Sequence, residues 1–378
     1  MSSTEHNEPD SSHPKEDVQA NRLSEEGIQW LRGTGAQQDI VLSSRVRLAR
    51  NLAGVPFVNQ ASATDLRHVI DTCRPVLEKA NLGPHTAWVD VQEANAIERA
   101  LLLERNLISR MLARGKRAAA RSKEPWPRGV AIGIPGERAS VMVNEEDHLR
   151  LQVMRSGFAL GDAWQEANTI DDAIEAQIDF AFRPRFGYLT ACPTNVGTGI
   201  RLSVMLHLPG LRMTGEIDKV KRAASDMSLA VRGFYGEGSE TLGDFYQLSN
   251  QTTLGRSEQQ LLEELESNIV PRVLEYERSS RKQLLDKRRW QLEDTVHRAF
   301  GVLTQARLLN TEEAINLLSV LRLGVALGLI DDLDMVTIHK LMLLIQPAHL
   351  QRAVGHKIGQ DVRKRERARL VREHITRT

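Results

Sequence analysis

Cysteine is scarce in this sequence of 378 residues, which contains only Cys73 and Cys192. Two cysteines cannot build a disulfide scaffold and have no zinc-type spacing, so a reducing cytoplasm is the simplest setting. Long apolar runs are missing too, because the longest conspicuous one, residues 323–330, is far shorter than the ~20 residues of a membrane span. The polar, acidic N-terminus lacks the pattern of a signal peptide. We therefore expect a soluble, cytoplasmic protein without a membrane contact.

An excess of charge of either sign is also absent, since 50 Lys and Arg balance 49 Asp and Glu to a net charge of +1. No global field draws the chain to nucleic acid or to a membrane, so any anion site must come from local clustering. The common nucleotide motifs are missing as well: there is no GxxxxGK(S/T) phosphate loop and no HRD or DFG motif. A nucleotide site in this chain would therefore have to be built from other residues than these motifs.

Composition and periodicity divide the chain into three parts. Residues 1–37 form a flexible N-terminal segment, rich at its start in Ser, Glu, Asp and Pro. In residues 38–256, strand-like runs such as 86–91 and 139–144 alternate with helical stretches, which predicts an α+β domain. From residue 257 the strand signal disappears, and apolar residues recur at helical spacing behind a Ser257 cap. Residues 257–378 are therefore predicted to be an all-α domain, with further helices over 311–327, 333–345 and from 360 onward.

Arginine recurs in four short polar blocks. The blocks read SSRVR at 43–47, NEEDHLR at 144–150, CPTNVGTGIR at 192–201 and RGFYGE at 232–237. In content and order they resemble the ATP:guanido phosphotransferases, the family of creatine and arginine kinases, over roughly residues 39–255. The resemblance implies a phosphagen-kinase-like catalytic domain, built as an antiparallel sheet flanked by helices and followed here by the all-α domain.

Within that family, the chain is most similar to the bacterial protein-arginine kinases. The resemblance is carried by SSRVRLARNLAGVPF at 43–57, and by TIHKL at 337–341 and QPAHLQ at 346–351 in the helical half. The chain also lacks the helical domain that kinases of free guanidines carry before this point. The resemblance therefore implies a kinase whose acceptors are arginine side chains of proteins.

A phosphoryl-transfer site needs fixed positive charge, because its transition state spreads negative charge over the phosphate oxygens. Planar guanidinium groups hold phosphates better than flexible ammonium groups do. By resemblance, the phosphates of ATP are held by Arg45, Arg47, Arg150, Arg201 and Arg232. The implied lining of the nucleotide is Ser43, Ser44, Arg45, Val46, Arg47, Arg201, Leu202, Ser203, Val204, Met205, Arg232, Gly233, Phe234, Tyr235, Gly236 and Glu237. Each arginine taken alone is more typical of a surface charge or half of an ion pair, and the motifs reverse this preference.

The acceptor poses the opposite problem, because a guanidinium is protonated at neutral pH and is a poor nucleophile. A carboxylate must orient it and take its proton. The resemblance assigns this role to Glu146, with Glu237 as a second carboxylate on a Gly-flanked loop and with Glu145 and Asp147 in support. An acidic turn that merely caps a helix is the alternative for an isolated run of this kind.

The two cysteines have different surroundings. Cys192 occupies the family's reactive-cysteine position, and the resemblance implies a supporting electrostatic role near the acceptor. An inert cysteine is the alternative, and direct in-line transfer requires no covalent cysteine intermediate. Cys73 lies among apolar residues and is predicted to be part of the core.

The chain departs from the subgroup pattern at two places. Asn106 stands where a histidine is often found, which puts adenine contacts there in doubt. The phosphoarginine-sensing RDxxRA motif is here RKRERA, so Arg363, Arg367 and Ala368 remain while Lys364 replaces the aspartate. The remaining residues predict an allosteric phosphoarginine site, with a solvated basic helix as the alternative and nucleic-acid binding as a weaker one, since no aromatic residues interleave.

The leading prediction is a cytoplasmic protein-arginine kinase that uses ATP and acts in protein quality control or the stress response. Mg²⁺ would enter bound mainly by phosphates and water, so no metal-ligating residue is predicted. The predicted partners are protein substrates with exposed arginines, a second copy of the chain, a Clp-type unfoldase, a heat-shock repressor and an activator protein. Two alternatives stay open: a kinase of a small free guanidino compound, and a non-catalytic regulator that binds phosphoarginine or nucleotide.

Overall fold

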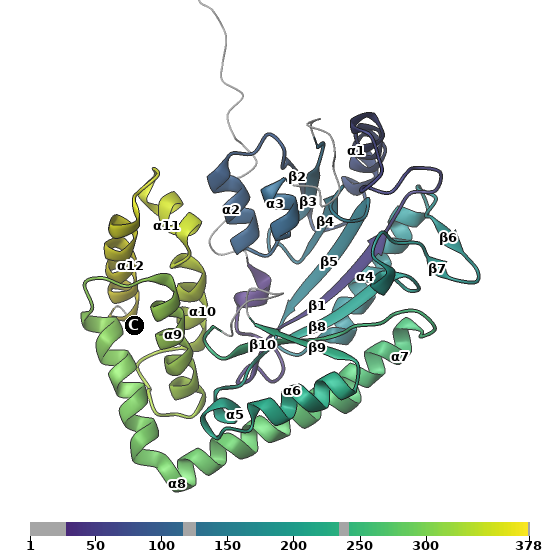
Figure 1. Ribbon diagram of the computed structural model, residues 1–378. Coiled ribbons are helices and arrows are strands. Elements are labelled where there is room, and N and C mark those ends of the chain that lie inside the picture. Colours follow the sequence, from purple (N-terminus) through teal and green to yellow (C-terminus); the bar gives the residue numbers. More distant parts are fainter. Residues whose placement is uncertain (1–27, 116–125, 234–241, 377–378) are drawn as a thin grey trace, which may run out of the picture.

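The computed structural model describes residues 28–115, 126–233 and 242–376 (Figure 1). Within these ranges an eight-stranded sheet has the order β2-β3-β4-β5-β1-β8-β10-β9, and all its neighbouring strands are antiparallel. The strands are β1 (Val41–Arg50), β2 (His85–Asp90), β3 (Gly129–Ile134), β4 (Ala139–Val143), β5 (Leu149–Ser156), β8 (Ile200–His207), β9 (Leu229–Gly233) and β10 (Phe245–Asn250), with a separate hairpin of β6 (Phe182–Arg183) and β7 (Gly187–Tyr188). The α+β class with an antiparallel sheet is confirmed.

The helices begin where the sequence supplies caps. Ser62 with Asp65, and Asn95 with Glu98, form capping boxes, and Ser257 caps the first helix of the C-terminal half as predicted. The α-helices are α1 (Ala63–Leu77), α2 (Ala96–Glu104), α3 (Arg110–Arg114), α4 (Leu160–Glu175), α5 (Pro209–Met213), α6 (Ile217–Asp226), α7 (Glu258–Glu263), α8 (Val270–Gln305), α9 (Thr311–Ala326), α10 (Met335–Leu344), α11 (Pro347–Val354) and α12 (Gln360–Ile375). Two short 3₁₀ helices, η2 (Gln29–Leu31) and η3 (Pro193–Asn195), and a π-helical segment, η4 (Glu264–Ile269), add to these. The three helices predicted after residue 310 are confirmed as α9, α10 and α12.

The two faces of the central strands have different environments. Side chains alternate along a strand, so Val46 and Leu48 of β1 enter the main hydrophobic core while Arg45 and Arg47 point to the other face. The core face is covered by α4 and by the apolar stretch from Leu261 to Leu274, which belongs to the same cluster as the sheet. The opposite face carries the polar residues that form the candidate site.

Helix α8 joins the sheet to a separate group of helices. It runs beneath the sheet and then changes direction (Figure 1), at Arg288, whose dihedral angles of −139° and 33° are not helical. Before this kink, Val270 and Val273 pack in the sheet core; after it, Leu303 packs against α9 and α10. We call residues 289–376 the helical region. The domain limit at residue 256 stays a prediction.

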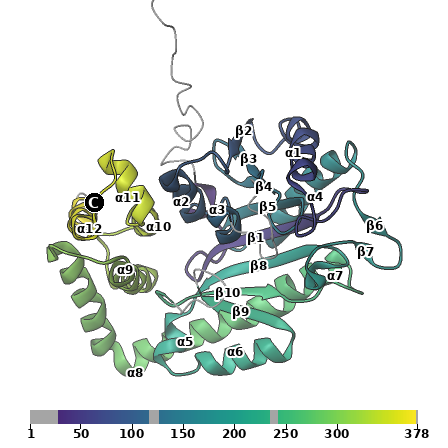
Figure 2. The same ribbon diagram turned by 45° about the horizontal axis from the view of Figure 1, so that its top comes forward.

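The helical region packs against the sheet through a second hydrophobic cluster. Trp30 and Leu31 of η2, Leu42 of β1 and Phe245 of β10 lie in one cluster with residues of α9, α10 and α12. A second contact between the helical region and the sheet domain joins α11 to α2 (Figure 2). Among the helices of the described ranges, none combines the length and the apolar character needed to cross a bilayer.

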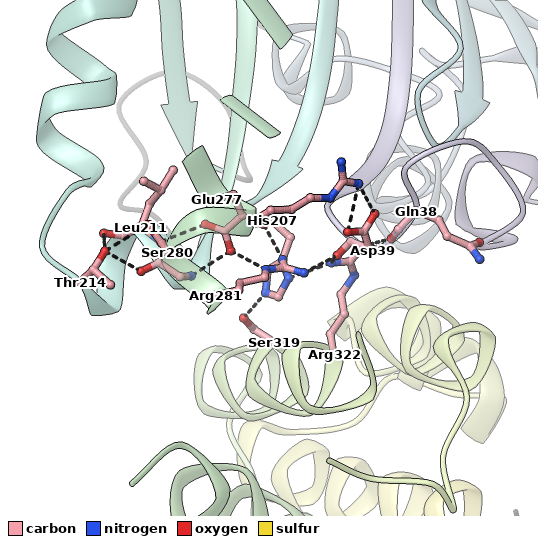
Figure 3. A network of polar contacts seen from close by, with 12 residues as sticks. Gln38, Asp39, His207, Leu211, Thr214, Glu277, Ser280, Arg281, Ser319 and Arg322 are labelled. Atoms are coloured by element: carbon pink, nitrogen blue, oxygen red, sulfur yellow. Dashed lines mark hydrogen bonds and ion pairs between the residues drawn. The ribbon is translucent and has the colours of Figure 1, made fainter. Parts of the chain in front are cut away.

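A buried polar network lies inside the same interface (Figure 3). Arg322 of α9, which is fully buried, donates to the backbone carbonyls of Gln38 and Asp39, at 2.7 and 3.1 Å. It also donates to His207 Nδ1 at 2.7 Å and to His339 Nε2 at 3.1 Å. Because an arginine can only donate, both ring nitrogens must be unprotonated acceptors. The network therefore joins α9 and α10 to the residues that immediately precede β1.

Candidate active site

A cleft of about 650 Å³ opens between the polar face of the sheet and the helical region. The sheet supplies four of the arginines expected to hold phosphate, namely Arg45, Arg47, Arg150 and Arg232. The opposite wall comes from the helical region and consists of Thr311, Met342, Leu343, Gln346 and Pro347. Residues that are more than 100 positions apart in the sequence therefore share one cavity.

The five predicted phosphate-binding arginines come together through strand pairing. Arg45 and Arg47 share a face of β1 because they are two positions apart, and Arg201 of β8 lies opposite Arg47. Burial, followed by the charges of Arg150, Arg201 and Arg232, lowers the pKa of Arg45 to about 10. The pKa of Arg47 also lies well below its usual value, first because of burial and then because of the charges of Arg45, Arg150 and Arg201. A polyanionic ligand would relieve this repulsion.

Polar neighbours fix the direction of several of these guanidinium groups. Arg45 donates to Gln247 Oε1 at 2.9 Å, and Arg201 donates to Ser249 Oγ at 3.2 Å. Arg150 forms an ion pair with Glu145 through an Nη1–Oε2 contact of 2.6 Å. Nε of Arg47 is buried and has no hydrogen-bond partner within the described residues. The cluster is therefore pre-oriented before any ligand arrives.

The acidic motif forms the turn of the β4–β5 hairpin. Asn144 closes the turn in a left-handed conformation, with a φ of 59°, and its side chain donates to the carbonyls of Leu66 and Pro127. Burial raises the pKa of Glu145. The charge of Arg150, together with hydrogen bonds from Ser109, Arg150 and the Glu146 backbone, outweighs burial, so that this pKa lies below its usual value. Glu145 also accepts the backbone N–H of Glu146 at 3.0 Å. Glu145 thus links Arg150, a predicted phosphate-binding arginine, to the predicted catalytic glutamate.

Asp147 connects this turn to the loop that carries the second cysteine. Its Oδ1 accepts from Ala191 N at 2.7 Å and from Asn51 Nδ2 at 2.6 Å. Cys192 follows directly, half-buried, with its Sγ 3.0 Å from Thr194 Oγ1. The predicted acceptor-side residues Glu146 and Cys192 are therefore held by one hydrogen-bonded framework, although their roles stay predictions.

Family comparisons agree with this geometry. The model of the ATP:guanido phosphotransferase C-terminal catalytic domain matches residues 68–280, and that of the protein-arginine kinase McsB C-terminal domain matches residues 289–378. The chain belongs to the ATP:guanido phosphotransferase family. Membership of this family implies the use of ATP. The second match covers the helical region. The helical region therefore resembles the C-terminal domain of one branch of the family, the protein-arginine kinases.

Curated relatives of this chain carry the name protein-arginine kinase, as two examples show. The protein of Symbiobacterium thermophilum is 43% identical over 350 residues, which cover 92% of this chain and 96% of that protein. The protein of Moorella thermoacetica is 44% identical over 352 residues, which cover 92% of this chain and 97% of its own length. The similarity therefore extends through the sheet and the helical region together.

Solved structures agree on the phosphagen-kinase fold. A duplicated taurocyamine kinase from Schistosoma mansoni, with bound transition-state-analogue components, is 25% identical at a TM-score of 0.58; the match covers 69% of this chain and 35% of that chain. A lombricine kinase is 23% identical at a TM-score of 0.54, and the match covers 74% of this chain and 73% of that chain. These neighbours support the fold of this family member.

Strand alternation separates the predicted nucleotide-lining residues into two groups. Ser43, Ser203 and Met205 share the arginine face and line a small cavity next to the main cleft. The structure places four others on the opposite face, where Ser44 hydrogen-bonds to Gly157 O and Ala159 N and the rest lie in the core; the four are Ser44, Val46, Leu202 and Val204. On β1 and β8, therefore, only every second residue of the predicted nucleotide lining faces the site.

The loop after β9 lies mostly outside the described residues. Gly233 is the buried last residue of β9. The remaining predicted residues of this loop, Phe234, Tyr235, Gly236 and Glu237, are beyond the described ranges. The role of Glu237 as a second carboxylate stays a prediction.

Several cleft residues escaped the prediction from sequence. Gln152 lies two positions after Arg150 on β5, so strand alternation from Arg150 could have identified it. Gln247 follows from the pairing of β10 with β9, where it is opposite Arg232. Trp30 also lines the cleft, together with Asn106, the position at which the sequence had put adenine contacts in doubt. No local sequence signal could have predicted that Trp30 lies at the cleft, because its position depends on packing against the helical region.

The predicted phosphoarginine residues lie on α12 in different environments. Ala368 is fully buried, and the buried Arg367 donates to the carbonyls of Ile345 and Leu309, at 2.8 Å each. Arg363 is half-buried and donates to Ile358 O at 2.8 Å. Of the three predicted residues, only Arg363 keeps part of its side chain accessible here. Phosphoarginine sensing by this segment stays a prediction.

Cys73 has the role expected of it. It is fully buried in the main core on α1, and burial raises the pKa of its thiol to about 12. A thiol of this kind is unreactive, and its assignment to the core is confirmed.

Proposed function

We propose that this chain is a protein-arginine kinase, which transfers the γ-phosphate of ATP to a guanidinium nitrogen of arginine side chains in proteins. The observation that carries the proposal is an arginine cluster built by four strands beside the carboxylate turn. Four of its members, Arg45, Arg47, Arg150 and Arg232, line one cleft. The fifth, Arg201, is close enough that its charge lowers the pKa values of Arg45 and Arg47. The names of the relatives, which are similar through both regions of the chain, support protein arginine as the acceptor. A kinase of a small free guanidine is the alternative acceptor specificity.

In the proposed reaction the arginine cluster holds the triphosphate and stabilises the charge of the transition state. The acceptor nitrogen forms a bond to Pγ as the bond from Pγ to the bridging oxygen breaks, and ADP leaves with that electron pair. The guanidinium proton passes to Glu146. Glu146 lies near the arginine cluster: burial lowers the pKa of Arg150, and the charge of Glu145 and then that of Glu146 raise it. Glu145 and Asp147 position the turn, and Cys192 and Glu237 complete the acceptor side.

Mg²⁺ fits this arrangement as an ion that arrives with the nucleotide. Within the described residues, no three His, Cys, Asp or Glu side chains gather to hold a metal. Mg²⁺ commonly keeps several waters and binds through substrate phosphates, and it would neutralise part of the phosphate charge. The arginines of the cleft would neutralise the rest of the phosphate charge.

The wider setting follows from the family branch. We propose that the chain acts in the cytoplasm in protein quality control or the stress response, as a homodimer joined through the helical region. Its proposed partners are a Clp-type unfoldase, a heat-shock repressor and an activator protein. We further propose that Arg363, Arg367 and Ala368 take part in an allosteric response to phosphoarginine.

The decisive experiment is incubation of the full chain with ATP, Mg²⁺ and a bacterial protein pool, followed by mass spectrometry for phosphoarginine. We expect phosphoarginine from the unaltered chain and its loss, by about 10²-fold or more in rate, from Glu146→Gln. Glu166→Gln is the matched control, because Glu166 pairs with Arg138 and Arg155 outside the cleft. Preferential phosphorylation of free arginine or creatine would support the small-guanidine alternative, and ATP binding without any product would support a non-catalytic regulator.

A further inference from the structure

The cleft has a definite direction along β1. At its distal end, Arg50 is followed by Asn51, which is hydrogen-bonded to Asp147 in the acidic turn. At its proximal end, β1 begins two residues after Asp39, whose carbonyl accepts a hydrogen bond from Arg322 of the helical region. The acceptor side of the site therefore lies at one end of the strand, and the helical region lies at the other.

A nucleotide bound along this strand has its orientation set by the arginines. Arg47 and its neighbour Arg150 are nearest to the acidic turn, so the transferred phosphate belongs there. Arg45 is two residues earlier, about 7 Å along the strand, next to Arg232 and Gln247. The phosphates that stay with the nucleoside belong beside it, and the base must then extend toward the helical region.

The wall that the base would meet has the composition of a ligand pocket. Met342 and Leu343 of α10 provide apolar surface, while Thr311 at the start of α9 and Gln346 before α11 add polar groups. The Gln346 amide is oriented by its hydrogen bond to Met342 O at 3.0 Å. Pockets for flat organic ligands are mostly apolar with a few placed polar groups. An aromatic base with a hydrogen-bonding edge matches this wall.

The wall is held in place on both sides of the cleft. On one side, Arg322 fastens α9 to the residues preceding β1. On the other, the Glu104 carboxylate of α2 accepts from the backbone N–H groups of Ala348 and His349, at 2.8 and 3.1 Å, and so caps α11. His349 Nδ1 also lies 2.8 Å from the same carboxylate. The wall is thus formed before the nucleotide binds.

We propose that the helical region is part of the nucleotide site, with Thr311 and Gln346 contacting the base while the sheet holds the phosphates. This inference rests on the proposed function, since it takes ATP as the ligand of the cleft. It assigns a direct role in ATP binding to helices that otherwise would serve only assembly or regulation. ATP affinity and the position of the helical region then depend on each other.

The test compares ATP with inorganic tripolyphosphate, which has the phosphates but no base. Calorimetric titration of the full chain should give weaker ATP binding for Thr311→Ala and for Gln346→Ala, by about two- to tenfold each, as expected for one lost hydrogen bond. Tripolyphosphate binding should be unchanged. Thr337→Ala is the matched control, since Thr337 is a half-buried threonine in the first turn of α10 and does not line the cleft.

Two outcomes would overturn the proposal: equal weakening of both ligands, or no change in either. If Gln346→Ala fails to fold, Thr311→Ala decides alone, because Thr311 is half-buried at a helix start and its loss leaves the α9 cap at Asn310 intact. The binding assay needs no phosphoryl transfer, so the two proposals can fail separately. A chain that binds ATP through this wall but makes no phosphoarginine would refute the kinase assignment alone.

Discussion

The arginines of the cleft form a cluster of like charge that suits the anionic ligand proposed for them. Like charges at neighbouring strand positions repel, and the lowered pKa values of Arg45 and Arg47 record both this repulsion and their burial. Such an arrangement costs folding free energy in the absence of a ligand. It becomes favourable when a triphosphate supplies the missing negative charge. Glu145 pairs with the cluster through its ion pair to Arg150.

Replacing Glu145 with glutamine should therefore affect both stability and ATP binding. The substitution removes the charge partner of Arg150 and the strong acceptor of the Glu146 N–H. We expect the free energy of unfolding to fall by about 1–3 kcal/mol and the Kd for ATP to rise by about tenfold. Urea denaturation and calorimetry would measure the two effects.

The control for this substitution is Glu166→Gln, which breaks an ion pair to Arg155 on the same strand as Arg150 but away from the cleft. It should lower stability without changing ATP affinity. Equal ATP affinity of Glu145→Gln and the unaltered chain would show that Arg150 needs no partner to bind phosphate.

At the scale of single elements, strand β1 shows what the sequence could predict and what it could not. The motif at residues 43–47 predicted a phosphate-binding strand, and these residues lie on β1. The period of two then decides that Arg45 and Arg47 face the cleft while Val46 lies in the core. The prediction took the motif as one continuous lining because the family's residues were carried over as a block. Applying the strand period to the same motif would have separated the two faces.

Helices α8 and α9 make a close contact that depends on a residue without a side chain. A Cβ atom added to Gly324 of α9 would lie 2.5 Å from Cγ1 of Val296 on α8. We expect Gly324→Ala to push the two helices apart and to lower the free energy of unfolding by about 1–3 kcal/mol. Thermal and urea denaturation would measure the loss.

Gly301→Ala is the matched control for this helix pair. Gly301 lies within α8, and a Cβ atom there would meet nothing within 4 Å. Its replacement should raise stability by about 0.5–1 kcal/mol, since alanine favours a helix. Opposite signs for the two alanine substitutions would support close packing of α9 on α8, whereas a stabilising Gly324→Ala would contradict it.

For the whole molecule, the arrangement of the helical region was beyond local sequence reasoning. Its helices were predicted from periodicity and caps, but their contact with the sheet joins Arg322 to Gln38 and Asp39, which are more than 280 positions away in the chain. The polar residues of this interface have no sequence signature, because each is satisfied only by partners brought together in the folded state. The helical wall of the cleft escaped prediction for the same reason.

The same interface should make the stability of the protein sensitive to acid. Burial, followed by the charges of Arg322, Arg281, His339 and Arg212, lowers the pKa of His207 well below its usual value. Burial, followed by the charge of Arg322, lowers the pKa of His339 to about 3. Both rings accept a hydrogen bond from Arg322, so protonation would place a second positive charge against the guanidinium.

The sign of the effect follows from proton linkage. Below the usual histidine pKa of about 6.5 the unfolded chain binds protons at these positions, while the folded chain stays unprotonated until about pH 3 at His339. Stability should therefore fall as the pH drops from about 7 toward 3, by about 1 kcal/mol per pH unit for each histidine. Urea denaturation at several pH values between 5 and 8 measures this slope. His339→Gln keeps an acceptor for Arg322 but cannot be protonated. The dependence of its unfolding free energy on pH should therefore be weaker by the contribution of one histidine, about 1 kcal/mol per pH unit. The exposed His85→Gln is the control, and identical slopes for both variants would mean that the interface histidines do not govern the acid response.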